Sequence, residues 1–138
     1  MLDVKPDRGL HDNMLSQWHR RLGWNLPAVD LDYPLIEYDK GLPVALIEYK
    51  YEKAQKIVLA HPTFRALSTL AERARLPFFV IRYKGDFSAF HVIPVNSYAK
   101  RKVQGEKFLS EAEYVKFLYW LRGYDCPRSI LDGLKVVI

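Results

Sequence analysis

The chain is predicted to be an α/β protein in which helices flank a mixed central β-sheet, and three observations predict this class. Apolar residues recur at helical spacing in three segments, and short β-rich runs lie between these segments. One helical segment separates two of the β-rich runs, so the strands on its two sides are expected to pair in parallel, whereas runs joined by tight turns pair antiparallel. The length of 138 residues, 49% hydrophobic and 27% charged, predicts one globular domain over residues 1–138.

Three helices are expected. The first covers residues 11–22 and the second residues 62–75, because each segment carries a stripe of apolar side chains at helical spacing. The third covers residues 110–121 and opens with a capping box, since Ser110 is followed three residues later by Glu113.

Four strands are expected around these helices. Residues 28–38 and 43–51 are two β-rich runs on either side of an Asp-Lys-Gly turn, which predicts an antiparallel hairpin. Residues 77–84 and 87–95 are two more runs, separated by a Gly-Asp turn. Pro34 lacks a backbone N–H, so the first hairpin strand is expected at the sheet edge or at a bulge. The predicted order is helix, hairpin, helix, strand, strand, helix.

Charge and composition narrow the function classes. The chain has 21 Lys and Arg against 16 Asp and Glu, a net charge of +5 and a pI near 9.3, which favours a polyanionic partner. The single cysteine, Cys126, excludes an intramolecular disulfide and a cysteine-based zinc site. No apolar run approaches the roughly 18 residues of a membrane span, and the first residues lack the apolar core of a secretory signal. We therefore expect a cytoplasmic protein without a membrane partner.

A charged pair ends the second hairpin strand. The run VALIEYK places four apolar residues, typical of a buried strand, directly before Glu48, Tyr49 and Lys50. Because side chains alternate along a strand, Glu48 and Lys50 share one face and Tyr49 lies on the other. Burying a charged pair is costly, so this pair either reaches solvent or belongs to a functional site.

The partner strand carries Asp30 and Asp32 at the same alternation, and the hairpin register decides whether they meet this pair. A three-residue loop with a left-handed glycine places Asp32 opposite Glu48 and Asp30 opposite Lys50. A two-residue turn pairs Asp32 with Tyr49 instead and separates the carboxylates. In the first register two carboxylates and a lysine meet, and such hard oxygen donors suit Mg²⁺ or Mn²⁺.

These residues resemble the PD-(D/E)XK nuclease superfamily. Asp32 is followed sixteen positions later by Glu48-Tyr49-Lys50, between a first helix and a helix–strand crossover. Phage-type and Holliday-junction-resolvase-like endonucleases are the nearest members in length, and the resemblance covers about residues 15–94. It implies an αβββαβ-like restriction-endonuclease core. It also implies that Asp32, Glu48 and the backbone carbonyl of Tyr49 bind the metal, while Lys50 orients or helps deprotonate the attacking water.

The chain departs from the family pattern in two places. The family's acidic residue, where present, sits on the first helix, but residues 13–29 contain no Asp or Glu, and His19 is the candidate for that place. The proline of the family name is also missing before Asp30 and before Asp32. The pattern therefore leaves open which aspartate is the ligand, and the register favours Asp32, with His19 and Asp30 in supporting positions.

The resemblance and the positive charge together predict a metal-dependent DNA endonuclease that hydrolyses phosphodiester bonds. Structure-selective cleavage or nicking is one option and sequence-specific restriction is another, and the sequence does not separate them. A homodimer is expected because one small domain carries one site and duplex cleavage needs two. The alternative is a non-catalytic nucleic-acid-binding module with a nuclease-like fold. The cations expected to contact DNA phosphates are Arg20, Arg21, Lys53, Lys56, Lys100, Arg101 and Lys102.

Overall fold

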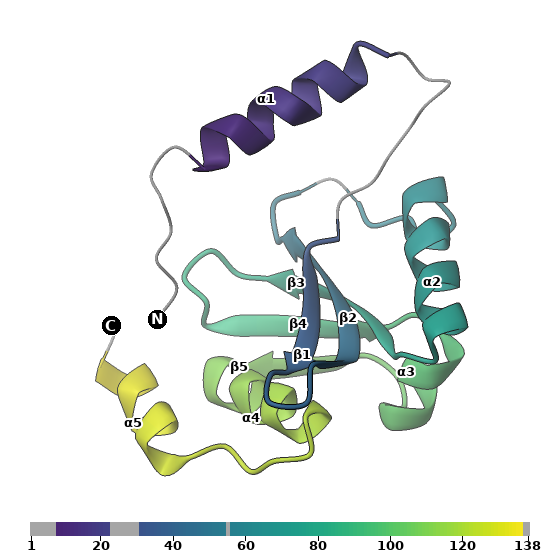
Figure 1. The fold of residues 1–138 in the computed structure, drawn as a ribbon. Helices are drawn as coiled ribbons and strands as arrows, with labels where there is room; N and C mark the ends of the chain where they lie inside the picture. The colour runs from purple at the N-terminus through teal and green to yellow at the C-terminus, as the bar shows by residue number, and fades with distance from the viewer. Residues whose placement is uncertain (1–7, 23–30, 55, 137–138) are drawn as a thin grey trace. The chain divides into compact units, whose positions relative to one another are not determined.

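The structure is a computed structural model that describes residues 8–22, 31–54 and 56–136. The chain divides into two units, residues 1–30 and residues 31–138. The first unit contains the helix α1 (Arg8–Arg20), which confirms the first predicted helix with an earlier start and end (Figure 1). The second unit contains the other described elements.

The second unit is built on a five-stranded sheet with four helices. Its strands are β1 (Tyr33–Glu37), β2 (Leu42–Tyr51), β3 (Phe78–Tyr83), β4 (Ala89–Pro94) and β5 (Lys107–Ser110). Its helices are α2 (Pro62–Ala74), α3 (Ser97–Lys102), α4 (Glu111–Leu121) and α5 (Arg128–Val136).

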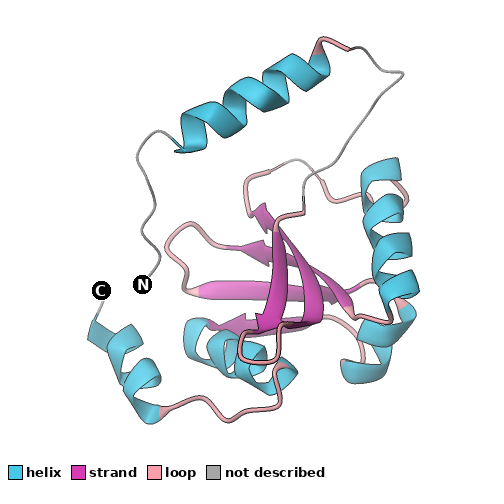
Figure 2. Cartoon of the chain, viewed as in Figure 1, coloured by secondary structure: helices cyan, strands magenta, loops and turns pink. Residues whose placement is uncertain are grey.

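The sheet is mixed, as the sequence predicts. The strands lie in the order β1-β2-β3-β4-β5; β2 and β3 pair in parallel, and the other neighbours pair antiparallel. The connection between β2 and β3 contains α2, because parallel neighbours need a crossover. Helices cover both faces of the sheet (Figure 2). The α/β class, with a mixed central sheet and flanking helices, is confirmed.

The element order adds detail to this class. Between α1 and α2 the described residues contain two strands, where an αβββαβ order has three, and residues 23–30 lie outside the described part of the chain. The sequence pattern does not predict α3, β5 or α5. With six and four residues, α3 and β5 are too short to show a clear period.

The two longer helices of this unit begin at capping residues. His61 precedes α2, and its Nδ1 accepts a hydrogen bond from the Thr63 N–H at 3.2 Å. Ser110 precedes α4, and the predicted capping box with Glu113 is present in both directions. These bonds satisfy N–H groups that the first helical turn leaves unpaired. None of the helices in the described residues is long and apolar enough to cross a membrane.

The β1–β2 hairpin has the register predicted for the candidate site. Tyr33 pairs with Ile47 in the antiparallel ladder. Continuing this register by one residue places Asp32 opposite Glu48. The alternative register, in which Asp32 faces Tyr49, is thereby excluded.

The turn of this hairpin differs from the prediction. Glu37 rather than Tyr38 faces Leu42, so the loop is one residue longer than expected. Gly41 has φ of +62°, the left-handed conformation that the prediction required. A β-bulge further along the pair absorbs the extra residue and restores the predicted register beyond it. Pro34 lies on β1, an edge strand, where a missing N–H is tolerated, as predicted.

The two faces of the sheet are covered by different helices. One face packs against α2, whose Phe64 is buried there, and the other packs against α4, whose Tyr114 is buried. Side chains alternate along β2, so its even-numbered residues face α2 and its odd-numbered residues face α4. Glu48 and Lys50 therefore lie on the α2 side of the sheet, at the end of β2.

The Asn96 side chain links the amino end of β3 to the end of the α2–β3 connection and to the first turn of α3. Its Oδ1 accepts hydrogen bonds from the Phe78 N–H at 2.9 Å and the Ala99 N–H at 3.0 Å. Its Nδ2 donates to the Leu76 carbonyl at 2.7 Å. Because the side chain is buried, water cannot replace these bonds.

We expect Asn96→Ala to lower the free energy of unfolding by about 2–4 kcal/mol, because it leaves buried backbone groups unpaired and removes the cap of α3. Urea denaturation of both proteins measures the change. Ser110→Ala is the control, since it removes a cap at an exposed position and should cost about 1 kcal/mol. Equal losses in the two variants would contradict the role assigned to Asn96.

Candidate functional site

The candidate site lies at the carboxyl ends of β2 and β3, beside the first turn of α2. The Lys50 ammonium lies 5.6 Å from the centre of the Phe64 ring, and Phe64 belongs to that first turn. In open α/β sheets, ligands bind outside the carboxyl ends of the strands. The amino end of a helix also attracts anions, because its N–H groups and dipole point at them.

Glu48 is the buried carboxylate of the site. It is 7% exposed, because it directly follows the buried apolar residues of β2. The pKa of Glu48 is raised from 4.5 to about 7, first by burial and then by the charge of the Asp32 carboxylate and a hydrogen bond with it. The neighbouring Lys50 ammonium opposes this rise. The two carboxylates that the register brings together therefore interact.

Lys50 stands beside this pair on the same face. Its Nζ lies 3.7 Å from Glu48 Oε1, and its side chain is 36% exposed. Tyr49 lies on the opposite face, where its hydroxyl forms a 2.6 Å hydrogen bond with the Tyr114 hydroxyl. The predicted alternation is thus confirmed. Asp32 is also exposed, so the site opens to solvent on one side of the buried glutamate.

The Tyr49 backbone carbonyl points toward the same corner of the sheet. Even-numbered residues at the end of β2 bond to β3, since the Glu52 N–H donates to the Tyr83 carbonyl. Backbone polar groups alternate in direction along a strand, so the Tyr49 carbonyl points to the β1 side. The same register places Leu31 opposite Tyr49, directly before Asp32 in the chain, so this carbonyl lies on the side of β2 that carries Asp32.

The donor set fits a hard divalent cation. Two carboxylates and a main-chain carbonyl are oxygen ligands, and Mg²⁺ or Mn²⁺ commonly keeps water on its remaining positions. The repulsion between Asp32 and Glu48, visible in the raised pKa of Glu48, is relieved when a cation lies between them. In the described ranges no group of three or more His, Cys, Asp or Glu side chains is arranged to hold a metal. Two carboxylates are therefore the side-chain ligands that this part of the chain offers.

A row of residues on the same face was not predicted from the sequence. Arg82 of β3 pairs with Lys50, and His91 of β4 pairs with Arg82. Residues paired in this way share a face, so the three side chains form a row across neighbouring strands. His91 hydrogen-bonds Glu106, and its ring stacks on Phe108 with 4.2 Å between centroids. Alternation in FFVIRYK shows that Arg82 and Val80 share a face, but only the β2–β3 register places Arg82 next to Lys50.

The predicted phosphate-binding residues of this unit fall into two groups. Lys53 and Lys56 are exposed in the connection between β2 and α2, at the carboxyl edge that carries the site. Lys100, Arg101 and Lys102 lie on α3, which follows the end of β4. Because β4 runs antiparallel to β3, its carboxyl end lies next to the amino end of β3. The helix α3 is therefore at the opposite end of the strands from the candidate site. The structure brings the first group to the candidate site and does not bring the second.

The remaining predicted residues belong to the other unit. His19, Arg20 and Arg21 lie on or directly after α1, so their roles at the site stay predictions. Asp30 lies outside the described residues. Asp32 is the aspartate that the described register brings to Glu48.

Comparison with known proteins gives no relative. The chain matches no model of a known protein family, and no curated protein or solved structure is significantly similar to it.

Proposed function

We propose that the chain is a metal-dependent DNA endonuclease that hydrolyses phosphodiester bonds and has a PD-(D/E)XK-like core. One observation carries the proposal: Asp32 interacts with the buried Glu48 at the carboxyl end of β2, with the Lys50 ammonium 3.7 Å from Glu48. In this proposal β1, β2, α2 and β3 are the strand, strand, helix and strand that carry the family motif.

Each residue of the site has a separate role in the proposal. Asp32, Glu48 and the Tyr49 carbonyl would hold Mg²⁺ or Mn²⁺, which when bound neutralises charge on a phosphate oxygen and lowers the pKa of a water. Lys50 positions the attacking water or takes its proton, since its amine is tethered beside Glu48 and reachable from solvent. These groups together supply the charges that phosphodiester hydrolysis needs.

The charged groups around the two carboxylates favour the binding of an anionic substrate. Arg82, Lys53 and Lys56 place cations on the side of the sheet that carries the carboxylates or in the connection next to it. The amino end of α2 adds its N–H groups and dipole. The proposal includes a homodimer, because the described chain carries one such site and cutting both strands of a duplex requires two.

The proposal is tested with a cleavage panel. Supercoiled plasmid, linear duplex, flap, four-way junction and single-stranded DNA are incubated with the protein in Mg²⁺, in Mn²⁺ and in EDTA. We expect cutting of at least one substrate in the presence of metal and none in EDTA. Metal-independent cutting would contradict the metal site, and no cutting of any substrate would contradict the enzyme.

We expect Asp32→Asn to abolish a Mn²⁺ site of about millimolar affinity or tighter, measured by calorimetry, and to lower cleavage by at least about 100-fold. Asp39→Asn is the matched control, because Asp39 is exposed in the turn at the other end of the hairpin and should change neither property. Salt-sensitive DNA binding without Mn²⁺ binding in the parent protein would favour the non-catalytic module instead.

A further inference from the structure

A second candidate site lies on the other face of the sheet, bounded by α3, β5 and α4. It is a pocket of about 500 Å³, a volume within the usual range of small-molecule sites. Its apolar lining includes Val92, Val103, Leu109 and Phe117. The pocket thus offers an apolar floor large enough for one planar ring system.

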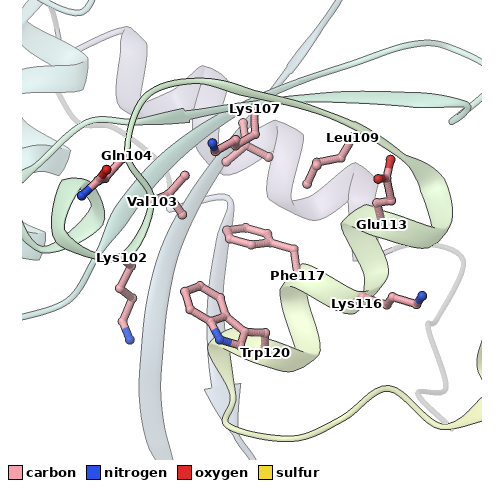
Figure 3. Close-up of a pocket in the computed structure, with 10 residues that line it drawn as sticks. Lys102, Val103, Gln104, Lys107, Leu109, Glu113, Lys116, Phe117 and Trp120 are labelled. Carbon is pink, nitrogen blue, oxygen red and sulfur yellow. The ribbon is translucent and has the colours of Figure 1, made fainter.

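Two aromatic side chains of α4 form one wall of this pocket (Figure 3). The Phe117 and Trp120 rings have centroids 6.0 Å apart and planes 30° apart. Trp120 is 51% exposed, an unusual position for a tryptophan that has no ligand or partner to cover it. A ring in the pocket would cover part of this indole.

Lysines stand around the aromatic wall. The Lys102 ammonium lies 5.5 Å from the centre of the Trp120 ring. Lys107 pairs with Val92 on the neighbouring strand, so its side chain lies on the same face as the apolar floor. Neither lysine forms an ion pair with another described residue. Figure 3 shows Lys102 and Lys107 opposite the α4 side of the pocket.

The acidic residue of the lining, Glu113, stays a negative charge near Lys116 and offsets only part of the lysine charge. The Glu113 carboxylate accepts a 2.8 Å hydrogen bond from the Ser110 N–H as part of the α4 capping box. That bond lowers the pKa of Glu113 and holds the carboxylate at the start of the helix. A third lysine of the lining, Lys116, follows on the next turn of α4. Three lysines against one carboxylate leave the lining with a net positive charge around an aromatic wall.

We propose that this pocket binds one nucleotide, with the base against Phe117 and Trp120 and the phosphate at Lys102 and Lys107. Bases stack on aromatic side chains without sequence preference, and ammonium groups bind phosphate as point charges. An acidic peptide would use the lysines but leave the rings uncovered, and an uncharged aromatic ligand would leave the lysines without a partner. A nucleotide satisfies both halves of the pocket. Its source is either a free mononucleotide or an unpaired nucleotide in a single strand.

This site is separate from the carboxylate site. Val92 pairs with Ile81, whereas Glu48 pairs with Val80, and consecutive residues of β3 face opposite sides of the sheet. The sheet therefore lies between the two sites. Binding in the pocket does not rest on the proposed nuclease activity, and it can be measured in EDTA with the Asp32→Asn variant.

The experiment uses this Asp32→Asn chain, with Trp120→Ala and Lys107→Ala added singly. Heteronuclear NMR follows the Trp120 indole N–H and the backbone signals during titration with AMP, adenosine, inorganic phosphate, a 5′-phosphorylated thymidine pentanucleotide and a glutamate pentapeptide. We expect AMP or the pentanucleotide to shift the signals of Val103, Leu109 and Trp120. Each added substitution should weaken this binding by about tenfold, because each removes one half of the recognition. Lys40→Ala, at an exposed hairpin turn, is the control and should bind as the parent does.

The titrations with different ligands distinguish the possible occupants of the pocket. Shifts with AMP identify a free nucleotide as sufficient, and shifts with the pentanucleotide alone identify a single strand; both support the proposal. Tighter binding of AMP than of adenosine and of phosphate also supports it, because it shows that both halves are used. The proposal is overturned if neither nucleotide shifts these signals at about 5 mM, if the glutamate peptide produces the same shifts, or if binding survives both substitutions.

Discussion

Lys50→Ala is expected to lower the single-turnover rate of DNA cleavage by about 10²- to 10⁴-fold, the range typical of acid–base and electrostatic groups. The reason is geometric: the Lys50 ammonium lies beside the Glu48 carboxylate and is reachable from solvent, where an attacking water would stand. Metal affinity should change little, because the carboxylates remain. In this variant we therefore expect metal binding to be retained while the cleavage rate falls.

The assay conditions follow from the charges at the site. Lys50 lowers the pKa of Glu48, so its removal leaves Glu48 more difficult to ionise. Cleavage should accordingly be compared at about pH 8.5 and at saturating Mg²⁺, where Glu48 is ionised in both proteins. Lys40→Ala is the matched control, because Lys40 is exposed at the opposite end of the hairpin.

Two other roles for Lys50 predict different results. A simple phosphate clamp would lose DNA affinity and about one unit of salt slope together, with turnover at saturating DNA nearly unchanged. A structural role through the ion pair with Glu48 would lower the melting temperature. Melting temperature, DNA affinity at two salt concentrations and single-turnover rate on the same variant distinguish the three. Normal turnover in Lys50→Ala would remove the catalytic assignment.

The local part of the site could be predicted from the sequence because it depends on short-range rules. Alternation alone places Glu48 and Lys50 on one face and Tyr49 on the other, and the structure confirms this. The pairing of Asp32 with Glu48 needed the hairpin register as well. That register was predicted correctly from a turn that was itself one residue too short, since a bulge compensates for the longer loop.

The parts that could not be predicted depend on contacts between distant segments. A parallel pairing of β2 and β3 follows from the helical crossover, but its register does not, and the register is what sets Arg82 beside Lys50. The elements α3 and β5 are short and held by tertiary contacts, such as the bonds of Asn96. The second pocket, between α3, β5 and α4, was consequently invisible in the sequence. Lys102, predicted from the sequence to contact DNA phosphates, lines that pocket.

Glu48→Gln is expected to have opposite effects on stability and on function. The buried Glu48 has its pKa raised to about 7, whereas an unfolded glutamate keeps the ordinary value of 4.5. Between these two values the folded chain holds a proton that the unfolded chain has lost. The contribution of Glu48 to the free energy of unfolding is therefore fully present below about pH 4.5 and is lost as the pH rises through 7.

A glutamine at position 48 cannot ionise, so Glu48→Gln removes the loss of stability that the parent shows as the pH rises. We expect Glu48→Gln to unfold with a free energy about 1–3 kcal/mol higher than the parent at about pH 8 in EDTA, with no gain near pH 4.5. Urea denaturation at the two pH values measures it. Glu37→Gln is the control: Glu37 is also buried but pairs with Arg122 at 3.1 Å, so its replacement should destabilise the protein at about pH 8.

Metal is expected to reverse the order of the two proteins. If Mn²⁺ binds the parent through Glu48 and Asp32, as proposed, it should raise the parent's melting temperature at about pH 8, with a stabilisation that grows with the logarithm of the Mn²⁺ concentration over the dissociation constant. Glu48→Gln lacks the charged ligand, so Mn²⁺ should leave its melting temperature unchanged and support no cleavage. Glu48 lowers the stability of the metal-free chain, because it is buried and repelled by Asp32. We expect such a carboxylate where a cation binds, because the cation relieves this repulsion. If Glu48→Gln were less stable than the parent at about pH 8 in EDTA, the glutamate would be a structural group. If it were more stable yet cleaved DNA at the parent's rate, Glu48 would not be a ligand of the catalytic metal.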